Sequence, residues 1–337
     1  MLEGRFELLL INAQHFKAVP GRKTDVKDTS GSRNYCNTGC CFVPPTAVRD
    51  LRDLNRNRAI LVQQRAAISN RIEKVLEDAN VKLASVASHV LGQSGRAMLH
   101  AMSTGEEDVD KLAEMARAKL RNKIPELRVA MAGTVRDHHR FALQQWLLQL
   151  EAVEKQIAEF EVEIGRRNQP FAEAVERLLT IPGVDRITAC ALVAEIGTNM
   201  AQFPTAQHLA SWAGICPGNQ ESAGKRLSGQ TRKGNPWLRR VLCQAAWAAS
   251  HTKNTYLSAQ FHRLAARRGK KRAIIAVAHS ILVIAYYLLS RGEQYRDRGS
   301  DYFDRINSEG LNLKRHLVKR LEGLGHKVKL EAATPES

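Results

Sequence analysis

The sequence has 337 residues, with 51 Lys and Arg against 34 Asp and Glu, so its formal net charge is +17. Its length allows two or three domains, each large enough to bury a core, and a hydrophobic content of 44% excludes wholesale disorder. The surplus of positive charge makes a polyanion, above all nucleic acid, the expected partner. Six Cys in a chain of this length do not form a disulfide framework, which indicates a reduced, cytoplasmic protein.

The first region, residues 1–45, opens with a strand-like run from Phe6 to Ile11 and continues into a segment without apolar periodicity, Thr29–Cys41. That segment is rich in Gly, Ser, Asn and Cys, and it is therefore predicted to be a loop. The first residues lack a basic stretch followed by a long apolar run, so no signal peptide is predicted.

Residues 46–168 are predicted to be mostly helical. Apolar residues recur every three or four positions from Val48 to Ala79 and again from His139 to Arg166. Two such amphipathic stretches can pack as an antiparallel hairpin, or they can pair between protomers as a coiled coil does. An ordinary helical bundle is an equally open interpretation.

Residues 169–330 are also predicted to be helix-rich, and 331–337 are a tail. Between Ser222 and Gly292 there is no Asp or Glu but there are 14 Lys and Arg, a pattern that indicates phosphate binding. Within this stretch, Ala273–Ser290 holds 18 residues without a formal charge, which is near the lower limit for a membrane span. His279 and Ser280 at its centre favour a buried core helix, so no membrane association is expected.

The segment from Leu178 to Gly197 has the pattern of a helix-hairpin-helix, with Pro182, Gly183 and Val184 at the turn. A glycine there lets the backbone approach a phosphate, and the following helix start offers free N–H groups. These three residues are therefore predicted to contact nucleic acid. The alternative is an ordinary turn between packed helices.

A glycine-rich basic segment follows, from Pro217 to Arg226, and Ser222 stands within it. Neighbouring cations can stabilise charge that develops when a serine attacks phosphorus, but by itself this signal is weak, because most such serines only contact phosphate or solvent. The cations in and after this segment are predicted to contact phosphates: Lys225, Arg226, Arg232, Lys233, Arg239 and Arg240.

Asp25 and Asp28 are three residues apart, so on a helix both carboxylates would project from one face. Oxygen ligands so placed suit Mg²⁺ or Mn²⁺. A solvated helix turn explains the pair equally well, since a metal site needs further ligands. The Cys and His residues show no zinc-ligand spacing, and no nucleotide-binding loop is present.

Taken together, these segments resemble the transposases of the insertion-sequence 110/116/902 family, and the resemblance covers nearly the whole chain. The matching phrases, in chain order, are Leu2–Glu7, Asn12–His15, Val19–Asp28, Phe42–Pro45, Arg49–Leu54, Asn70–Asn80, Ile181–Val184, Phe203–Gly214 and Ser222–Arg226.

The resemblance implies a RuvC-like domain of the RNase H type (an α/β fragment here, residues 1–45), a helical coiled-coil linker (46–168) and a helical C-terminal transposase domain (169–330), in a chain that is mainly α. It implies catalysis by Asp, Glu, Asp, Asp and a serine that holds DNA covalently, with Asp25 and Asp28 as the last two carboxylates and Ser222 as the nucleophile. It further implies Mg²⁺ or Mn²⁺ as cofactor, homo-oligomers, a structured guide RNA and association with the nucleoid.

The sequence departs from the family pattern where the first Asp and the Glu would stand, and Thr29–Cys41 replaces an expected helix. The chain is therefore expected to be an N-terminally truncated copy with impaired catalysis, with Thr29–Cys41 read as a short frame-shifted patch. The motif at Ser222 reads Ser-Ala-Gly-Lys where Ser-Gly-Gly-Lys is commoner. A non-catalytic DNA- or RNA-binding protein that oligomerises, or a decayed remnant, are the alternatives.

Overall fold

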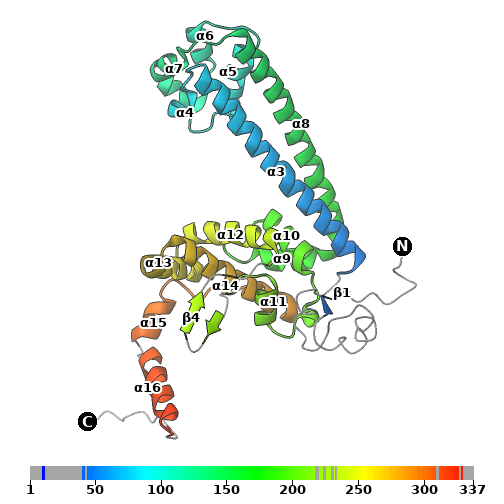
Figure 1. Ribbon diagram of the computed structural model, residues 1–337, viewed down its shortest axis with the longest axis vertical. Coiled ribbons are helices and arrows are strands. Elements are labelled where there is room, and N and C mark those ends of the chain that lie inside the picture. The colour runs from blue at the N-terminus through cyan, green and yellow to red at the C-terminus, as the bar shows by residue number, and fades with distance from the viewer. Residues whose placement is uncertain are drawn as a thin grey trace. The chain divides into compact units, whose positions relative to one another are not determined.

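The structure is a computed structural model that describes residues 10–11, 40–41, 44–216, 220–222, 225–228, 231, 234–308, 311–325 and 328. The chain divides into two compact units. Unit 1 comprises Met1–Arg49 and Pro170–Ser337, and unit 2 comprises Asp50–Gln169. Helices predominate in the described part of both units, which confirms the expected mainly α architecture (Figure 1).

Unit 2 consists of two long helices with four short helices and a 3-10 helix between and beside them. Its elements are α3 (Thr46–Asp78, which begins just before the unit), α4 (Leu83–Val86), α5 (Gln93–Ser103), α6 (Val109–Glu114), the 3-10 helix η2 (Ala118–Lys123), α7 (Ile124–Met131) and α8 (Asp137–Arg167). The two long helices are the amphipathic stretches expected from the sequence.

Helices α3 and α8 lie side by side and run antiparallel (Figure 1). Three contacts join them: Arg167 to Asp50, Arg58 to Glu161, and the Arg71 guanidinium over the Trp146 ring. The partner on α8 moves toward the N-terminus as the residue on α3 moves toward the C-terminus, so the pair is a hairpin within one chain. Pairing between protomers stays a prediction.

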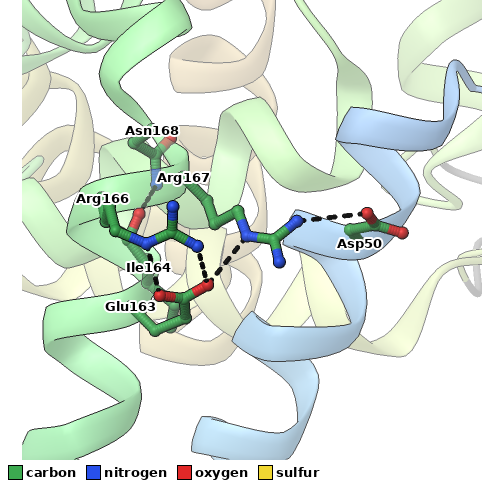
Figure 2. A network of polar contacts seen from close by, with 6 residues as sticks. All are labelled: Asp50, Glu163, Ile164, Arg166, Arg167 and Asn168. Atoms are coloured by element: carbon green, nitrogen blue, oxygen red, sulfur yellow. Dashed lines mark hydrogen bonds and ion pairs between the residues drawn. The ribbon is translucent and has the colours of Figure 1, made fainter.

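A network of charges closes the base of this hairpin (Figure 2). Arg166 donates two hydrogen bonds to Glu163, of 2.7 and 2.6 Å, and Arg167 donates a third of 2.8 Å. Arg167 also reaches Asp50 on α3 at 3.3 Å. The hydrogen bonds from Arg166 and Arg167 favour the ionised carboxylate and lower the pKa of Glu163 to about 2.

The other end of the hairpin carries the core of unit 2. Apolar side chains of α3 and α8 pack there with those of the short helices, and Ile72, Leu83, Leu99 and Leu127 are fully buried. Arg96 on α5 holds this core against α8 through two hydrogen bonds to Glu154, of 2.7 and 2.6 Å.

Unit 1 holds the remaining elements. They are β1 (Leu10–Ile11), β2 (Cys40–Cys41), η3 (Gln169–Phe171, which begins at the end of unit 2), α9 (Ala172–Leu179), α10 (Arg186–Ile196), η4 (Met200–Gln202), α11 (Ala206–Trp212), β3 (Gln220–Ser222), β4 (Lys225–Ser228), α12 (Pro236–His251), α13 (Tyr256–Arg268), α14 (Lys270–Arg291), α15 (Tyr302–Ser308) and α16 (Leu311–Gly323).

Helix α14 is the centre of unit 1, where it packs against α9, α11, α12 and α13. By length and composition it is the one described helix that could cross a membrane. Its apolar residues nevertheless pack on other helices, and Val277, Ala278 and Ile281 are fully buried. Its place among these four helices explains its composition, as the expectation of a core helix required.

Two short strand pairs differ from the expected loops. Cys40 and Cys41 pair antiparallel with Ile11 and Leu10, although Thr29–Cys41 was expected to be loop throughout. Strands β3 and β4 form a hairpin where a flexible loop was expected. Ladders this short need no alternation of apolar residues, which is why periodicity does not detect them. The rest of 1–43 and the tail 331–337 lie outside the described residues, so the RuvC-like fragment stays a prediction.

Candidate functional site

The candidate nucleophile lies in a β-hairpin of unit 1, which we call the serine hairpin (β3, β4 and the connecting residues 223–224). Ser222 is the last residue of β3 and pairs with Lys225, the first residue of β4. Glu221 pairs with Arg226 in the same ladder. The backbone therefore brings Ser222 opposite a lysine across a two-residue connection, so that the expected nucleophile and the expected cations belong to one structural element.

The chain that follows the serine hairpin is anchored to helices. Arg239, in the second turn of α12, donates a hydrogen bond of 2.7 Å to the Thr231 hydroxyl. Gly234 then packs directly against the end of α11, and a Cβ placed on it would lie 2.5 Å from the backbone nitrogen of Gly214. Since no real Cβ comes so close, only glycine fits there. These two contacts fix where the hairpin leaves the helical body.

Asn235 joins this anchor to α10. Its Oδ1 accepts hydrogen bonds from the backbone N–H groups of Trp237 and Leu238, which caps α12. Its Nδ2 donates a hydrogen bond of 2.5 Å to Glu195, whose side chain belongs to a residue only 2% exposed. Sequence reasoning missed Glu195. The signal that could have found it is one acidic residue inside the otherwise apolar run Ala189–Ile196.

The expected helix-hairpin-helix turn lies between α9 and α10, as its sequence indicated. Gly183 has a φ of +83°, and a Cβ there would lie 2.5 Å from the Ala245 carbonyl oxygen of α12. Val184 is buried, and the Asp185 carboxylate accepts a hydrogen bond from the Thr188 N–H and so caps α10. The glycine thus serves packing against α12. Contact of Pro182, Gly183 and Val184 with nucleic acid stays a prediction.

The other expected phosphate contacts are placed unequally. Lys225 and Arg226 belong to β4, and Arg239 is half-buried by its hydrogen bond to Thr231. Arg240 is exposed, with its guanidinium 5.3 Å from the centre of the Trp237 ring. The remaining members, Arg232 and Lys233, lie outside the described residues.

The expected metal ligands, Asp25 and Asp28, also lie outside the described residues. Within the described ranges, no three His, Cys, Asp or Glu side chains gather as they would around a metal ion. Cys190 and Cys243 are free thiols, and burial raises the pKa of each. Neither is therefore poised as a thiolate at neutral pH.

Comparison with known proteins connects this site to a family. Residues 175–263 match the family model described as "Transposase IS116/IS110/IS902 family". The matched span runs from α9 into α13, so it includes the serine hairpin, Glu195 and Asn235.

Individual relatives carry similar descriptions. The transposase for insertion sequence element IS1111A of Coxiella burnetii is 26% identical over 85% of this chain and 72% of its own length. A putative transposase, y4pF/y4sB, of Sinorhizobium fredii is 33% identical over 37% of this chain and 33% of its own length. The uncharacterized 43.6 kDa protein of insertion element IS110 of Streptomyces coelicolor is 33% identical over 36% of this chain and 30% of its own length. The resemblance inferred from the sequence is thereby confirmed.

Proposed function

We propose that this chain, whose residues 175–263 match the IS116/IS110/IS902 transposase family, cuts and rejoins DNA at the ends of a mobile element, with Ser222 as the nucleophile. The observation that carries the proposal is the anchored serine hairpin inside the family match. A nucleophile needs a fixed position relative to its substrate, and the contacts of Arg239, Gly234 and Asn235 supply a rigid base for it.

The proposed chemistry is a transesterification. The Ser222 oxygen attacks a backbone phosphorus, a new serine O–P bond forms, and the P–O bond to one sugar oxygen breaks. The serine loses its proton, and the departing sugar oxygen gains one. Attack by a sugar hydroxyl on the serine phosphodiester reverses these changes and rejoins DNA. Because the number of phosphodiesters is conserved, the exchange needs no external energy source.

DNA binding in this proposal rests on charge. The segment from Ser222 to Gly292 has 14 cations and no carboxylate, so unit 1 can hold several phosphates at once. The cations of the serine hairpin and of α12 would hold the strand that Ser222 attacks. Such contacts position a duplex without reading its sequence, so target choice must come from another source.

A structured guide RNA is our proposal for that source, and a homo-oligomer is our proposal for the active assembly. An excess of positive charge accommodates two polyanions on one protein. The exchange of two DNA ends needs two copies of the nucleophile. A protein with these partners would work in the cytoplasm of a prokaryote, at the nucleoid.

The metal site remains the weakest part of the proposed activity. Asp25 and Asp28 would hold Mg²⁺ or Mn²⁺, for which carboxylate oxygens are suitable ligands, and the ion would stabilise charge at the phosphate. The printed sequence supplies two of the four carboxylates that the family resemblance implies. We therefore propose that this polypeptide cleaves DNA slowly or not at all by itself, and that a relative with all four restores cleavage in a mixed assembly.

The test uses covalent capture. The full chain, alone and mixed with a relative that has all four carboxylates, is incubated with labelled element-end DNA and Mg²⁺, and then separated on a denaturing gel. Ser222→Ala should abolish the protein–DNA adduct formed by this chain and leave DNA binding unchanged. Ser228→Ala, at the far end of the same hairpin, should keep both.

An adduct that survives Ser222→Ala would overturn the assignment of the nucleophile. If the chain binds DNA but forms no adduct in either setting, its function is binding alone, as in a non-catalytic protein that oligomerises. These outcomes are separable because binding and covalent capture are measured on the same samples.

A further inference from the structure

The turn between α13 and α14 is the most densely charged exposed segment that the structure describes in unit 1. Residues 267–272, here called the basic turn, contain five cations around Gly269, and all five are exposed: Arg267, Arg268, Lys270, Lys271 and Arg272. Gly269 has a φ of +82°, and a Cβ placed there would meet nothing within 4 Å. The turn therefore faces open space.

These cations have no partner among the described residues, for none of the five makes an ion pair or a hydrogen bond through its side chain there. Elsewhere the chain pairs its arginines with carboxylates, as Arg58 does with Glu161 and Arg128 with Asp110. The contrast marks the basic turn as a place where positive charge is left uncompensated.

The elements packed against α13 and α14 bring no carboxylate to the turn. Asp297 accepts a hydrogen bond from the Tyr256 N–H, at the beginning of α13, and α13 is 13 residues or about 20 Å long. On α9, Glu173 pairs with Arg177, whose guanidinium lies next to Gly292, at the far end of α14. Helices α11 and α12 contain no Asp or Glu.

The position of three of these cations opposes the stability of the fold. Lys270, Lys271 and Arg272 form the first turn of α14, where the helix dipole is positive, and Gly269 offers no side chain to cap it. Positive side chains are unfavourable at that end of a helix. Charge that the helix itself disfavours, and that no carboxylate compensates, requires an explanation outside the folded chain.

We infer that the basic turn is a second DNA-binding surface, which grips the phosphate backbone of a duplex apart from the strand that Ser222 attacks. The inference rests on the proposed function. A duplex presents closely spaced phosphates that exposed cations can contact while counterions are released. Single strands are instead held by bases stacked on aromatic rings, and residues 267–272 contain no aromatic residue.

The test compares two triple variants of the full chain. Lys270→Gln with Lys271→Gln and Arg272→Gln removes three charges from the basic turn. Lys119→Gln with Arg121→Gln and Lys123→Gln removes three charges from exposed positions on η2 in unit 2. The probes are a short duplex DNA of arbitrary sequence, a duplex RNA and a single-stranded DNA, each titrated over a range of salt concentrations.

The basic-turn variant should bind duplex DNA roughly 100-fold more weakly at about 0.1 M salt, and its log–log salt slope should fall by about 2 to 3. Its thermal midpoint should stay the same or rise, since the substitution relieves the helix dipole. The η2 variant should bind within about threefold of the unaltered chain, because it loses the same net charge elsewhere.

Equal affinities and slopes for the two variants would overturn the surface and leave the proposed function standing. Weaker binding of duplex RNA alone, or of single strands alone, would overturn the assignment to duplex DNA. Failure of the unaltered chain to bind any DNA would overturn the proposed function, and this surface with it.

Discussion

The Asn235 side chain donates a hydrogen bond of 2.5 Å from Nδ2 to the carboxylate of Glu195, while its Oδ1 caps α12. One amide thus bonds to two helices directly after the serine hairpin. Glu195 is only 2% exposed, so its bond to Asn235 is made away from water. A change at either residue should alter both the stability of unit 1 and the position of the hairpin.

Asn235→Ala should lower the free energy of unfolding by about 2–3 kcal/mol. Loss of a helix cap costs about 1 kcal/mol, and loss of a hydrogen bond to a buried carboxylate costs about 1.5 kcal/mol more. Urea denaturation measures the sum. Asn199→Ala is the control, since exposed Asn199 caps the 3-10 helix η4 and bonds to no carboxylate, and it should cost no more than about 1 kcal/mol. Equal costs for the two variants would contradict the role given to Glu195.

Asn235→Asp should keep the cap and give the protein a new pH dependence. Aspartate is as good a cap as asparagine, but it would place a second carboxylate against Glu195. Repulsion raises the pKa of one carboxyl in the folded state above its unfolded value. Stability is then greatest at low pH and decreases as pH rises, so the deficit relative to the unaltered chain should grow from about pH 5 to about pH 7. Thermal midpoints across this range check the sign, and a constant deficit would exclude the repulsion.

Gly183→Ala should be much more destabilising than Gly269→Ala, although the two φ angles are nearly the same, +83° and +82°. Both variants place a side chain in a left-handed conformation, which costs about 1–2 kcal/mol. Only at Gly183 would the new methyl group overlap another helix, at Ala245 and Ala249 of α12, which adds about 1–3 kcal/mol. The difference between the two denaturation midpoints isolates the clash. A difference near zero would mean that α12 moves aside freely.

The Arg96–Glu154 pair should contribute stability that disappears in acid. The hydrogen bond from Arg96 is the main reason why the pKa of Glu154 lies below its ordinary value of 4.5. A lowered carboxyl pKa stabilises the folded state above the unfolded pKa, and that contribution is lost as pH falls through the folded pKa. Glu154→Gln should therefore cost about 0.5–1 kcal/mol at neutral pH and progressively less below about pH 4. Glu159→Gln, an exposed change on the same helix, should leave the pH profile unaltered.

Local patterns predicted the helices of this protein well, because an amphipathic period reports which face of a helix is buried. The same reasoning gave Gly183 a partner of the wrong kind to explain its conservation of space: the close neighbour is α12, some 60 residues later in the chain, and no local pattern shows a tertiary contact. The serine hairpin was missed because small polar residues hide a short ladder. Glu195 was missed because its importance arises only from the partner that the fold brings to it.

The ion pair between Asp50 and Arg167 has a consequence for how the chain is assembled. Its two residues lie where the polypeptide enters and leaves unit 2, so a short polypeptide bridge could span the entry and exit points. All of unit 2 could be replaced by a few glycine and serine residues without stretching the ends of unit 1. In evolutionary terms, unit 2 has the form of an insertion, a cassette that could be gained, lost or exchanged while the surrounding helices keep their own core.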